Sequence, residues 1–264
     1  YAATIARGRA RLGRALDDLR DLGIGGTAVG TGVNTEFGYA ARIVQQLRDD
    51  TGLAVREGAD RVQLMQSMGD VEAFHANLRV FASDLIKIAD DLRLMASGPR
   101  TGLNEIRIPA VQPGSSIMPG KVNPSVVEMV CQVCLQVVGN DATVSAASAH
   151  GELELNVMMP VIAHNVLFSL TILGNALRVL ADRCVVGIEA NREQAAYWVE
   201  RSAALATALA PVIGYAKAAE LATRSVTEGV LIRDLVEREQ VLPLAQLRHL
   251  LDLDRLTRGA IPPE

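Results

Sequence analysis

Aromatic residues are scarce in this chain. They make up 3% of its 264 residues, although hydrophobic residues make up 49%. The strands of β-sandwiches and β-barrels are enriched in aromatic and β-branched side chains, and proteins that bind single-stranded nucleic acids stack the bases on aromatic rings. The composition therefore argues against both classes. It leaves enough apolar material for a large buried core.

An excess of charge of either sign is also lacking. The chain has 26 Lys and Arg against 30 Asp and Glu, a formal net charge of −4, so we expect no nucleic-acid partner and no anionic membrane partner. Three cysteines cannot form a disulfide framework, which is typical of a reducing, cytoplasmic compartment. No apolar run reaches the roughly 18 residues of a membrane-spanning helix, and we expect no signal peptide.

Proline is missing from residues 1–98, whereas half of the ten prolines fall between residues 99 and 124. Because proline is costly inside helices, this distribution predicts a long helical region followed by an irregular segment. A heptad seam, the pattern of helical bundles, predicts a helix over residues 71–97. The seam consists of Leu78, Phe81, Leu85, Ile88, Leu92 and Met95.

A second long helix is predicted over about 155–183, and shorter helices follow it at about 191–208, 214–227 and 230–238, interrupted by Pro211. The apolar stripe of the long helix is expected to be Ile162, Val166, Leu170, Leu173, Leu177, Leu180 and Cys184.

The sequence thus predicts an all-α fold in two domains. Residues 1–187 are expected to form a bundle of long helices, N-terminally incomplete because Tyr1 already lies within a predicted helix, and residues 188–264 a small helical domain. The long apolar seams favour a bundle that is shared between subunits as an oligomer core. A self-contained bundle is the alternative.

Residues 98–122 form a long loop rich in Gly and Pro, and loops of this length are often functional. Its most informative part is GSSIMPGKVNP at 114–124. A phosphate-binding P-loop needs four residues between Gly and Gly-Lys and then Ser or Thr, whereas five residues separate the glycines here and Val follows Lys. The Gly-x-Ser-x-Gly elbow of serine hydrolases is absent as well. Both functions are therefore excluded.

A third chemistry fits this loop better. Asn123 and Pro124 predict the N-cap and the first residue of a helix that runs to about 147. A serine can act as a base if backbone N–H groups and a cation stabilise its alkoxide. Lys121 and the helix N-terminus would bind a substrate carboxylate and stabilise the dianion that forms when a proton leaves the neighbouring carbon. A solvated surface turn capped by Asn123 explains the same residues equally well.

The loop at 114–124 resembles the signature loop of the aspartase/fumarase superfamily of lyases. Further segments resemble the family in family order, namely GGTAVGTGVN at 25–34, SGPRTGLNEI at 97–106, GELELNVMMPV at 151–161 and GIEANRE at 187–193. The resemblance implies cleavage of a C–N or C–O bond β to a carboxylate of a small dicarboxylate substrate, with release of fumarate. It also implies a homotetramer whose active sites each combine three subunits, and neither an organic cofactor nor a metal.

The same resemblance assigns roles to single residues. Ser115 would be the general base that takes the Cβ proton, and Glu128 would match a catalytic acid that pairs with a family histidine. That histidine follows a threonine upstream of GGTAVGTG, and no Thr-His pair occurs in this chain. We therefore expect this chain alone to be inactive. The residues implied to bind substrate are Ser116, Lys121, Val122 and Asn123.

The resemblance favours one reaction. EMVCQVCLQVVGND at 128–141 and EIRIPAVQPGSSIM at 105–118 resemble aspartate ammonia-lyases, whereas His164-Asn165 and GIEANRE suit fumarases as well. Elimination of ammonia from L-aspartate is thus the first expectation. Fumarate hydration and an inactive assembly fragment are the alternatives.

Other polar residues carry weaker signals. Thr27, Thr31 and Asn34 either lie near a site or belong to a tight glycine-rich turn, and His150 is a minor candidate at a helix end. The four histidines show no metal-ligand spacing, and the Cys131-x-x-Cys134 pair is interpreted as buried packing.

Overall fold

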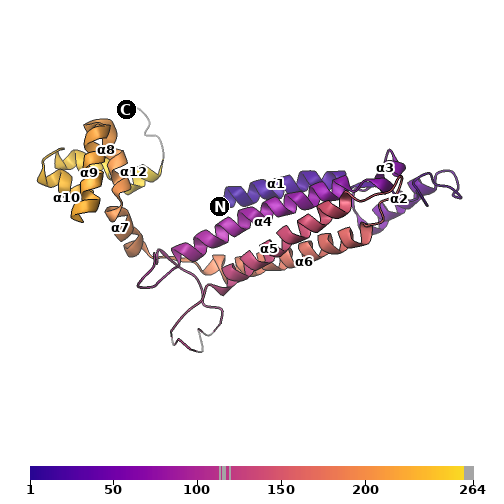
Figure 1. Ribbon diagram of the computed structural model, residues 1–264, viewed down its shortest axis with the longest axis horizontal. Helices are drawn as coiled ribbons and strands as arrows, with labels where there is room; N and C mark the ends of the chain where they lie inside the picture. The colour runs from indigo at the N-terminus through magenta and orange to yellow at the C-terminus, as the bar shows by residue number, and fades with distance from the viewer. Residues whose placement is uncertain (113, 115–116, 119, 259–264) are drawn as a thin grey trace. The chain divides into compact units, whose positions relative to one another are not determined.

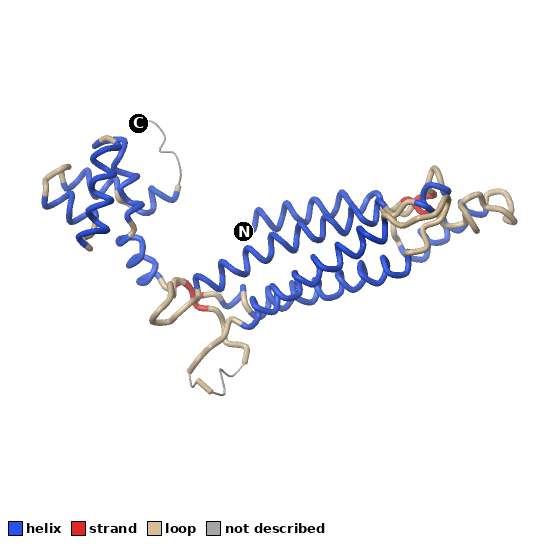
Figure 2. Tube along the Cα trace, in the orientation of Figure 1, coloured by secondary structure: helices blue, strands red, loops and turns tan. Residues whose placement is uncertain are grey.

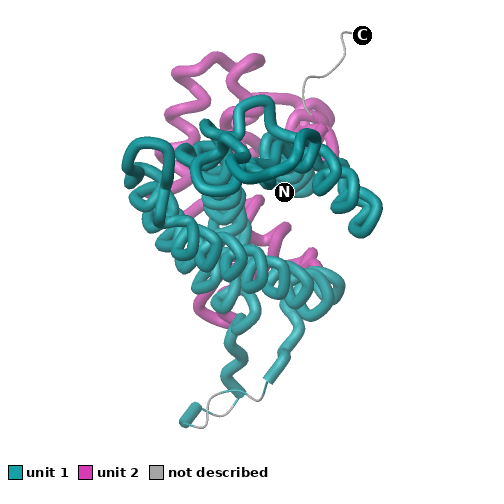
Figure 3. Tube along the Cα trace, turned by 90° about the vertical axis from the view of Figure 1, so that its right-hand side faces the viewer, with its two compact units in different colours: residues 1–94, 108–188 teal, residues 95–107, 189–264 magenta. Residues whose placement is uncertain are grey.

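The computed structural model describes residues 1–112, 114, 117–118 and 120–258. These residues are mostly helical (Figures 1 and 2), which confirms the predicted all-α fold. The chain divides into two compact units, coloured separately in Figure 3. Unit 1 consists of Tyr1–Leu94 and Ile108–Ile188, and unit 2 of Met95–Arg107 and Glu189–Glu264.

Unit 1 is built on a bundle of long helices. These are α1 (Ala2–Asp18), α4 (Gly69–Met95), α5 (Ser125–Ser148) and α6 (Met159–Arg183). Side-chain contacts show that neighbouring helices run antiparallel. Arg11 of α1 pairs with Asp84 of α4 at 2.7 Å, and the Tyr1 hydroxyl donates to Asp91 at 2.5 Å. Between α4 and α5, the Ser145 hydroxyl donates to Glu72 at 2.6 Å.

Shorter elements connect α1 to α4. They are β1 (Asp21–Leu22), α2 (Tyr39–Thr51), β2 (Arg56–Glu57) and α3 (Arg61–Gln66). The two strands pair in parallel, with Asp21 opposite Arg56 and Leu22 opposite Glu57. After α6, a 3-10 turn, η1 (Val185–Gly187), leads to unit 2.

The predicted seam of α4 faces inward. Leu78, Phe81, Leu85, Ile88 and Leu92 are all buried. The expected stripe of α6 is wrong at Leu170, which is 40% exposed, whereas the neighbouring Ser169 is fully buried. Ser169 takes the inward position because its hydroxyl hydrogen-bonds to a buried histidine of α4, described below.

The outward face of α6 is apolar. Among the described helices, the stretch Met159–Gly187 is long and apolar enough to cross a membrane by length and composition, with a mean hydropathy of 1.4. The sequence expectation of no such helix is therefore corrected. Polar residues such as Asn165 and Ser169 interrupt the apolar run, but these two are buried in the bundle, while Leu167 and Phe168 are exposed.

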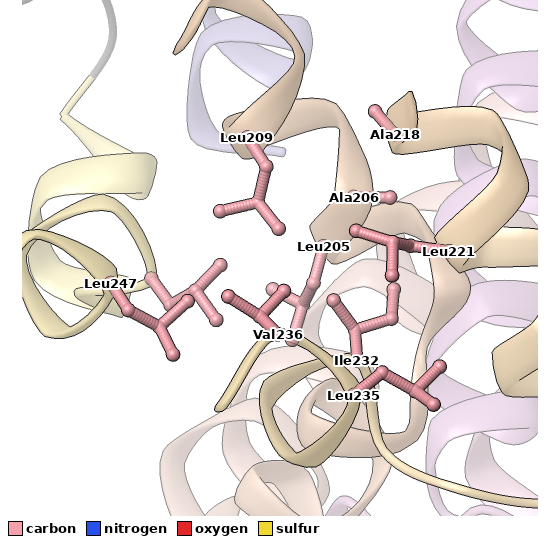
Figure 4. Packing of buried hydrophobic residues seen from close by; sticks show 10 residues of the cluster. Leu205, Ala206, Leu209, Ala218, Leu221, Ile232, Leu235, Val236 and Leu247 are labelled. Atoms are coloured by element: carbon pink, nitrogen blue, oxygen red, sulfur yellow. The ribbon is translucent and has the colours of Figure 1, made fainter. Parts of the chain in front are cut away.

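Unit 2 is a cluster of short helices around its own apolar core (Figure 4). They are α7 (Arg192–Arg201), η2 (Ala203–Leu205), α8 (Ala206–Ile213), α9 (Tyr215–Glu228), α10 (Ile232–Arg238), α11 (Leu244–Leu250) and α12 (Leu253–Thr257). Leu209, Leu221, Leu235 and Leu247 are fully buried in this core. Pro211 was expected to interrupt the helices, but it lies inside α8. This helix ends only at Ile213, before Gly214 with φ +81°.

Residues 95–107 also belong to unit 2, although unit 1 both precedes and follows them in the sequence. Strand β3 (Ile106–Arg107) pairs antiparallel with β4 (Glu189–Ala190), with Ile106 opposite Ala190 and Arg107 opposite Glu189. The sequence analysis expected two continuous domains, 1–187 and 188–264, and so did not predict that residues 95–107 belong to unit 2.

Candidate functional site

The candidate loop closes on itself at its base, between β3 and α5. The side-chain amide of Gln112 donates to the Ser125 hydroxyl at 2.6 Å. Further in, the Cα of Gly114 lies so close to Lys121 that a Cβ there would overlap the Lys121 carbonyl oxygen. The Lys121 N–H donates to the Met118 carbonyl at 3.2 Å. Glycine at 114 is therefore what lets the two arms of the loop approach.

The predicted substrate-binding residues that the structure describes lie on the returning arm of the loop. Lys121 is exposed, Val122 is 58% exposed and Asn123 is half-buried. The predicted base, Ser115, and its neighbour Ser116 lie outside the described residues, so their roles stay predictions.

Helix α5 begins one residue later than predicted. Its N-cap position is Pro124, with φ −78° and ψ 54°, whose side chain makes no capping hydrogen bond, whereas Asn123 was the expected cap. The first N–H groups of a helix carry a partial positive charge. Lys121 and this helix end therefore bring positive charge to one stretch of chain.

Glu128 lies in the first turn of α5 and is half-buried. One turn further, Cys131 Sγ lies 3.8 Å from Oδ1 of Asp90 on α4, and Asp90 pairs with Arg93 at 3.3 Å. Burial raises the pKa of the Cys131 thiol, and the negative charge of Asp90 adds to this effect. This face of α5 thus packs on charged residues of α4. A catalytic role for Glu128 stays a prediction.

The glycine-rich segment forms a tight turn. A Cβ on Gly30 would come within 2.5 Å of the Val62 backbone. Thr27 and Asn34 adopt positive φ angles of 56° and 65°, and the Thr27 hydroxyl donates to the Val33 carbonyl at 3.1 Å. Close backbone approach therefore explains the glycines. This agrees with the interpretation of the segment as a tight glycine-rich turn.

This turn follows the C-terminus of α1, and the candidate loop precedes α5. Since Tyr1 meets Asp91 and Cys131 meets Asp90, the start of α1 and the start of α5 lie at the same end of the bundle. The turn with Thr27, Thr31 and Asn34 therefore lies at the other end (Figure 1). His150 also lies at that other end, because it follows the C-terminus of α5, a helix about 36 Å long. The structure does not bring these residues to the loop.

Sequence analysis missed a buried polar network inside unit 1. His75 is fully buried on α4, with Nδ1 2.9 Å from Oδ1 of Asp141 and Nε2 2.9 Å from the hydroxyl of Ser169. The Asn140 amide donates to the same hydroxyl at 2.9 Å, and Arg79 Nε donates to Oδ2 of Asp141 at 2.8 Å. One sequence signal was available, because His75 stands three residues before Leu78 and so continues the α4 seam inward.

The Ser169 oxygen accepts from the Asn140 amide, and both ring nitrogens of His75 have a buried hydrogen-bond partner, Asp141 at Nδ1 and Ser169 at Nε2. The order Ser–His–Asp is that of a nucleophile, a base and an orienting acid. Since His75 and Ser169 have no exposed surface, no substrate reaches them. We interpret the network as structural.

Metal ligands are not clustered in the described part of the chain. There, no group of three or more His, Cys, Asp or Glu side chains lies close enough together to hold a metal ion.

Comparison with known proteins places these features in a family. Residues 1–139 match the family model described as "Lyase", and residues 205–258 match the one described as "Fumarase C C-terminus". Fumarate hydratase class II 2 of Pseudomonas aeruginosa is 43% identical over 99% of this chain and 57% of its own length. Aspartate ammonia-lyase of Bacillus subtilis is also 43% identical, over 99% of this chain and 55% of its own length. The chain thus spans about half the length of the curated relatives it matches.

Solved structures agree with this. A fumarate lyase:delta crystallin from Brucella melitensis, bound to cobalt, superposes with a TM-score of 0.90 at 45% identity, covering 97% of this chain and 55% of that one. A class II fumarase from Schistosoma mansoni also gives a TM-score of 0.90, at 31% identity over 96% of this chain and 56% of that one.

Proposed function

The chain belongs to the aspartase/fumarase superfamily of lyases, and from this premise we propose that the full-length protein releases fumarate from a dicarboxylate that carries an amino or hydroxyl group. The observation that carries the proposal is the returning arm of the loop. There the Lys121 ammonium group precedes the N-terminus of α5 by a few residues. Such an arrangement binds carboxylates.

The proposed chemistry begins with a proton transfer. Ser115 takes a proton from the carbon next to a substrate carboxylate, and the electron pair moves into that carboxylate to form an aci-carboxylate dianion. Lys121, Asn123 and the first N–H groups of α5 stabilise the added negative charge, which is greater in the transition state than in the substrate. Ser116 and Val122 complete the contacts of the loop with the substrate.

The second step expels the leaving group. The electron pair returns to form the carbon–carbon double bond of fumarate, and the bond to the neighbouring carbon's substituent breaks. Ammonia leaves directly from an ammonium substituent, whereas a hydroxyl group needs a proton to leave as water. Glu128 is proposed to take part in the proton transfers through a histidine that this chain does not contain.

We propose L-aspartate as the substrate, because residues 105–118 and 128–141 resemble aspartate ammonia-lyases and one such relative is 43% identical over 99% of the chain. Hydration of fumarate is the second candidate, because a class II fumarate hydratase is equally similar.

One experiment separates the two reactions. The full-length protein is mixed with fumarate, and the fumarate absorbance is followed with and without ammonium at constant ionic strength. For an aspartate ammonia-lyase, fumarate is consumed only when ammonium is present. Equal consumption without ammonium would make water the nucleophile and the protein a fumarase. No consumption in either condition would contradict both.

The proposed assembly is a cytoplasmic homotetramer. Its support is the apolar outward surface of the bundle, where Leu135 of α5 is 61% exposed and Leu167 of α6 is 64% exposed. Apolar surface of this kind marks an interaction site. For residues 1–264 alone we propose assembly without turnover. Size-exclusion chromatography with light scattering tests this, and a well-behaved monomer would contradict it.

A further inference from the structure

The segment that leads into the candidate loop is hydrogen-bonded to unit 2. The bonds are accepted by consecutive main-chain carbonyls of this segment. The indole Nε1 of Trp198 donates to the Leu103 carbonyl at 2.7 Å. The side-chain amide of Asn191 donates to the Asn104 carbonyl at 2.9 Å, and the backbone N–H of Asn191 donates to the Glu105 carbonyl at 2.8 Å. Helix α7 and the residue before it thus bind residues 103–105 one carbonyl after another.

The attachment continues beyond these carbonyls. Strand β3 follows directly and pairs with β4, so residues 103–107 are bound along their whole length. The segment is also closed on itself, because the N–H of Asn104 donates to the Ser97 carbonyl and that of Glu105 to the Met95 carbonyl, both at 2.8 Å. Residues 95–107 therefore form a defined piece of unit 2.

Chain connectivity then links unit 2 to the loop. Arg107 is the last residue of this piece, and Ile108, which belongs to unit 1, follows it. At Gln112 the loop is tied to Ser125 at the start of α5. Only a few residues thus separate the attachment on unit 2 from the base of the loop that carries Lys121 and Asn123.

We propose that Trp198 and Asn191 are positioning residues for this loop, through the segment that they hold. The proposal rests on the proposed function for its effect on the reaction, since it takes Lys121 and Asn123 to bind the substrate. Neither Trp198 nor Asn191 is required to touch the substrate. Each acts through the segment that it holds, because hydrogen bonds to consecutive carbonyls fix the position and the direction of residues 103–105 within unit 2, and the chain continues from this segment into the loop.

Two substitutions remove single donors. Trp198→Phe keeps an aromatic ring but loses the indole N–H. Asn191→Asp replaces the amide donor with a carboxylate oxygen, which repels the Asn104 carbonyl, but it keeps an oxygen that accepts from the Gln194 N–H at 3.4 Å and so caps α7. Tyr197→Phe is the matched control, because Tyr197 neighbours Trp198 on the same helix and its ring packs on Arg201, 3.5 Å from the guanidinium carbon.

The test uses the full-length protein and two readouts. Hydrogen exchange is measured at residues 103–108, at 110–112 and 121–123 of the loop, and in the unit 2 core around Leu209 and Leu235. Losing one hydrogen bond is expected to speed exchange at the segment and the loop about five- to tenfold, with the core unchanged. For the same variants kcat/KM with fumarate is expected to fall about fivefold or more, mainly through KM, whereas Tyr197→Phe stays within about twofold.

The outcomes separate this proposal from the proposed function. If exchange rises at residues 103–108 but not in the loop, and kcat/KM keeps its value, unit 2 does not position the loop and the proposal is overturned. If the unsubstituted protein has no lyase activity, the proposed function fails. In that case faster exchange in the loop of both donor variants still supports the positioning role, and unchanged exchange there overturns it.

Discussion

Nδ1 of His75 lies 2.9 Å from Oδ1 of Asp141 within unit 1, with the imidazole ring completely buried. The opposite ring nitrogen meets the Ser169 hydroxyl at the same distance. The pair therefore joins α4 to α5, and its histidine joins both to α6. Hydrogen bonds, in addition to apolar packing, fix how these helices align.

Replacing His75 with Ala should destabilise the protein by about 3 kcal/mol or more, because it leaves a cavity and buried partners without hydrogen bonds. The free energy of unfolding, measured by denaturant titration, is the test. His150→Ala is the control, since His150 is exposed, and its cost should stay within about 0.5 kcal/mol. Equal costs for the two variants would show that the network contributes nothing.

Replacing Ser115 with Ala in the full-length protein should remove turnover, because the hydroxyl group proposed to accept the substrate proton is lost. The oligomeric state, measured by light scattering, should not change. Ser83→Ala is a suitable control, because the Ser83 hydroxyl is exposed and donates within α4, to the Arg79 carbonyl at 3.0 Å. More than about a few per cent of residual activity would be inconsistent with Ser115 as the base.

Replacing Gly114 with Ala should disturb the loop, because the new methyl group would overlap the Lys121 carbonyl oxygen. Overpacking of this kind typically costs about 1–3 kcal/mol. We therefore expect kcat/KM to fall about tenfold or more, and the melting temperature to fall by about a few degrees.

The matched control is Gly13→Ala in α1, where a methyl group meets no atom within 4 Å. Alanine is the better helix former there, so this variant should be stabilised by up to about 1 kcal/mol with full activity. Wild-type activity in Gly114→Ala would mean that the two arms of the loop do not need to approach.

Cys134 should resist alkylation in the folded protein. Burial raises its pKa to about 12, so at pH 8 about one thiol in 10⁴ is ionised. Its reaction with iodoacetamide, followed by mass spectrometry, should be at least about a thousandfold slower than in denaturant. The half-exposed Cys131 provides an internal comparison and should react faster. Fast labelling of Cys134 in the folded protein would show that this part of α5 opens.

Periodicity predicted the long helices well, because a regular apolar seam has few alternative structures. The seam from Leu78 to Leu92 lies inward as expected. Periodicity failed at Leu170 and Ser169, where a hydrogen bond to His75 decides which side chain turns inward. A pattern of apolar residues on one helix cannot contain that information, because the partner is on another helix.

For the candidate site, the resemblance of the segment at 114–124 supplied most of the residues, and their roles stay predictions. The start of α5 at Ser125 instead of Pro124 was not predicted. Asn123-Pro124 fits both a cap followed by a first helical residue and a helix that begins after Pro124, and only the surrounding fold decides between them. The attachment of Leu103 and Asn104 to α7 had no local signal, because its donors are distant in sequence.

The discontinuity of unit 2 sets an order of events during synthesis. Residues 95–107 leave the ribosome before their partners Asn191 and Trp198 exist, and residues 108–188 must be made in between. At about 5–20 residues per second that interval is on the order of 4–16 s. The candidate loop and helices α5 and α6 are therefore complete while the segment that precedes them still lacks its partners. The C-terminal part of the chain is consequently the last to be made and completes a structure begun near its middle.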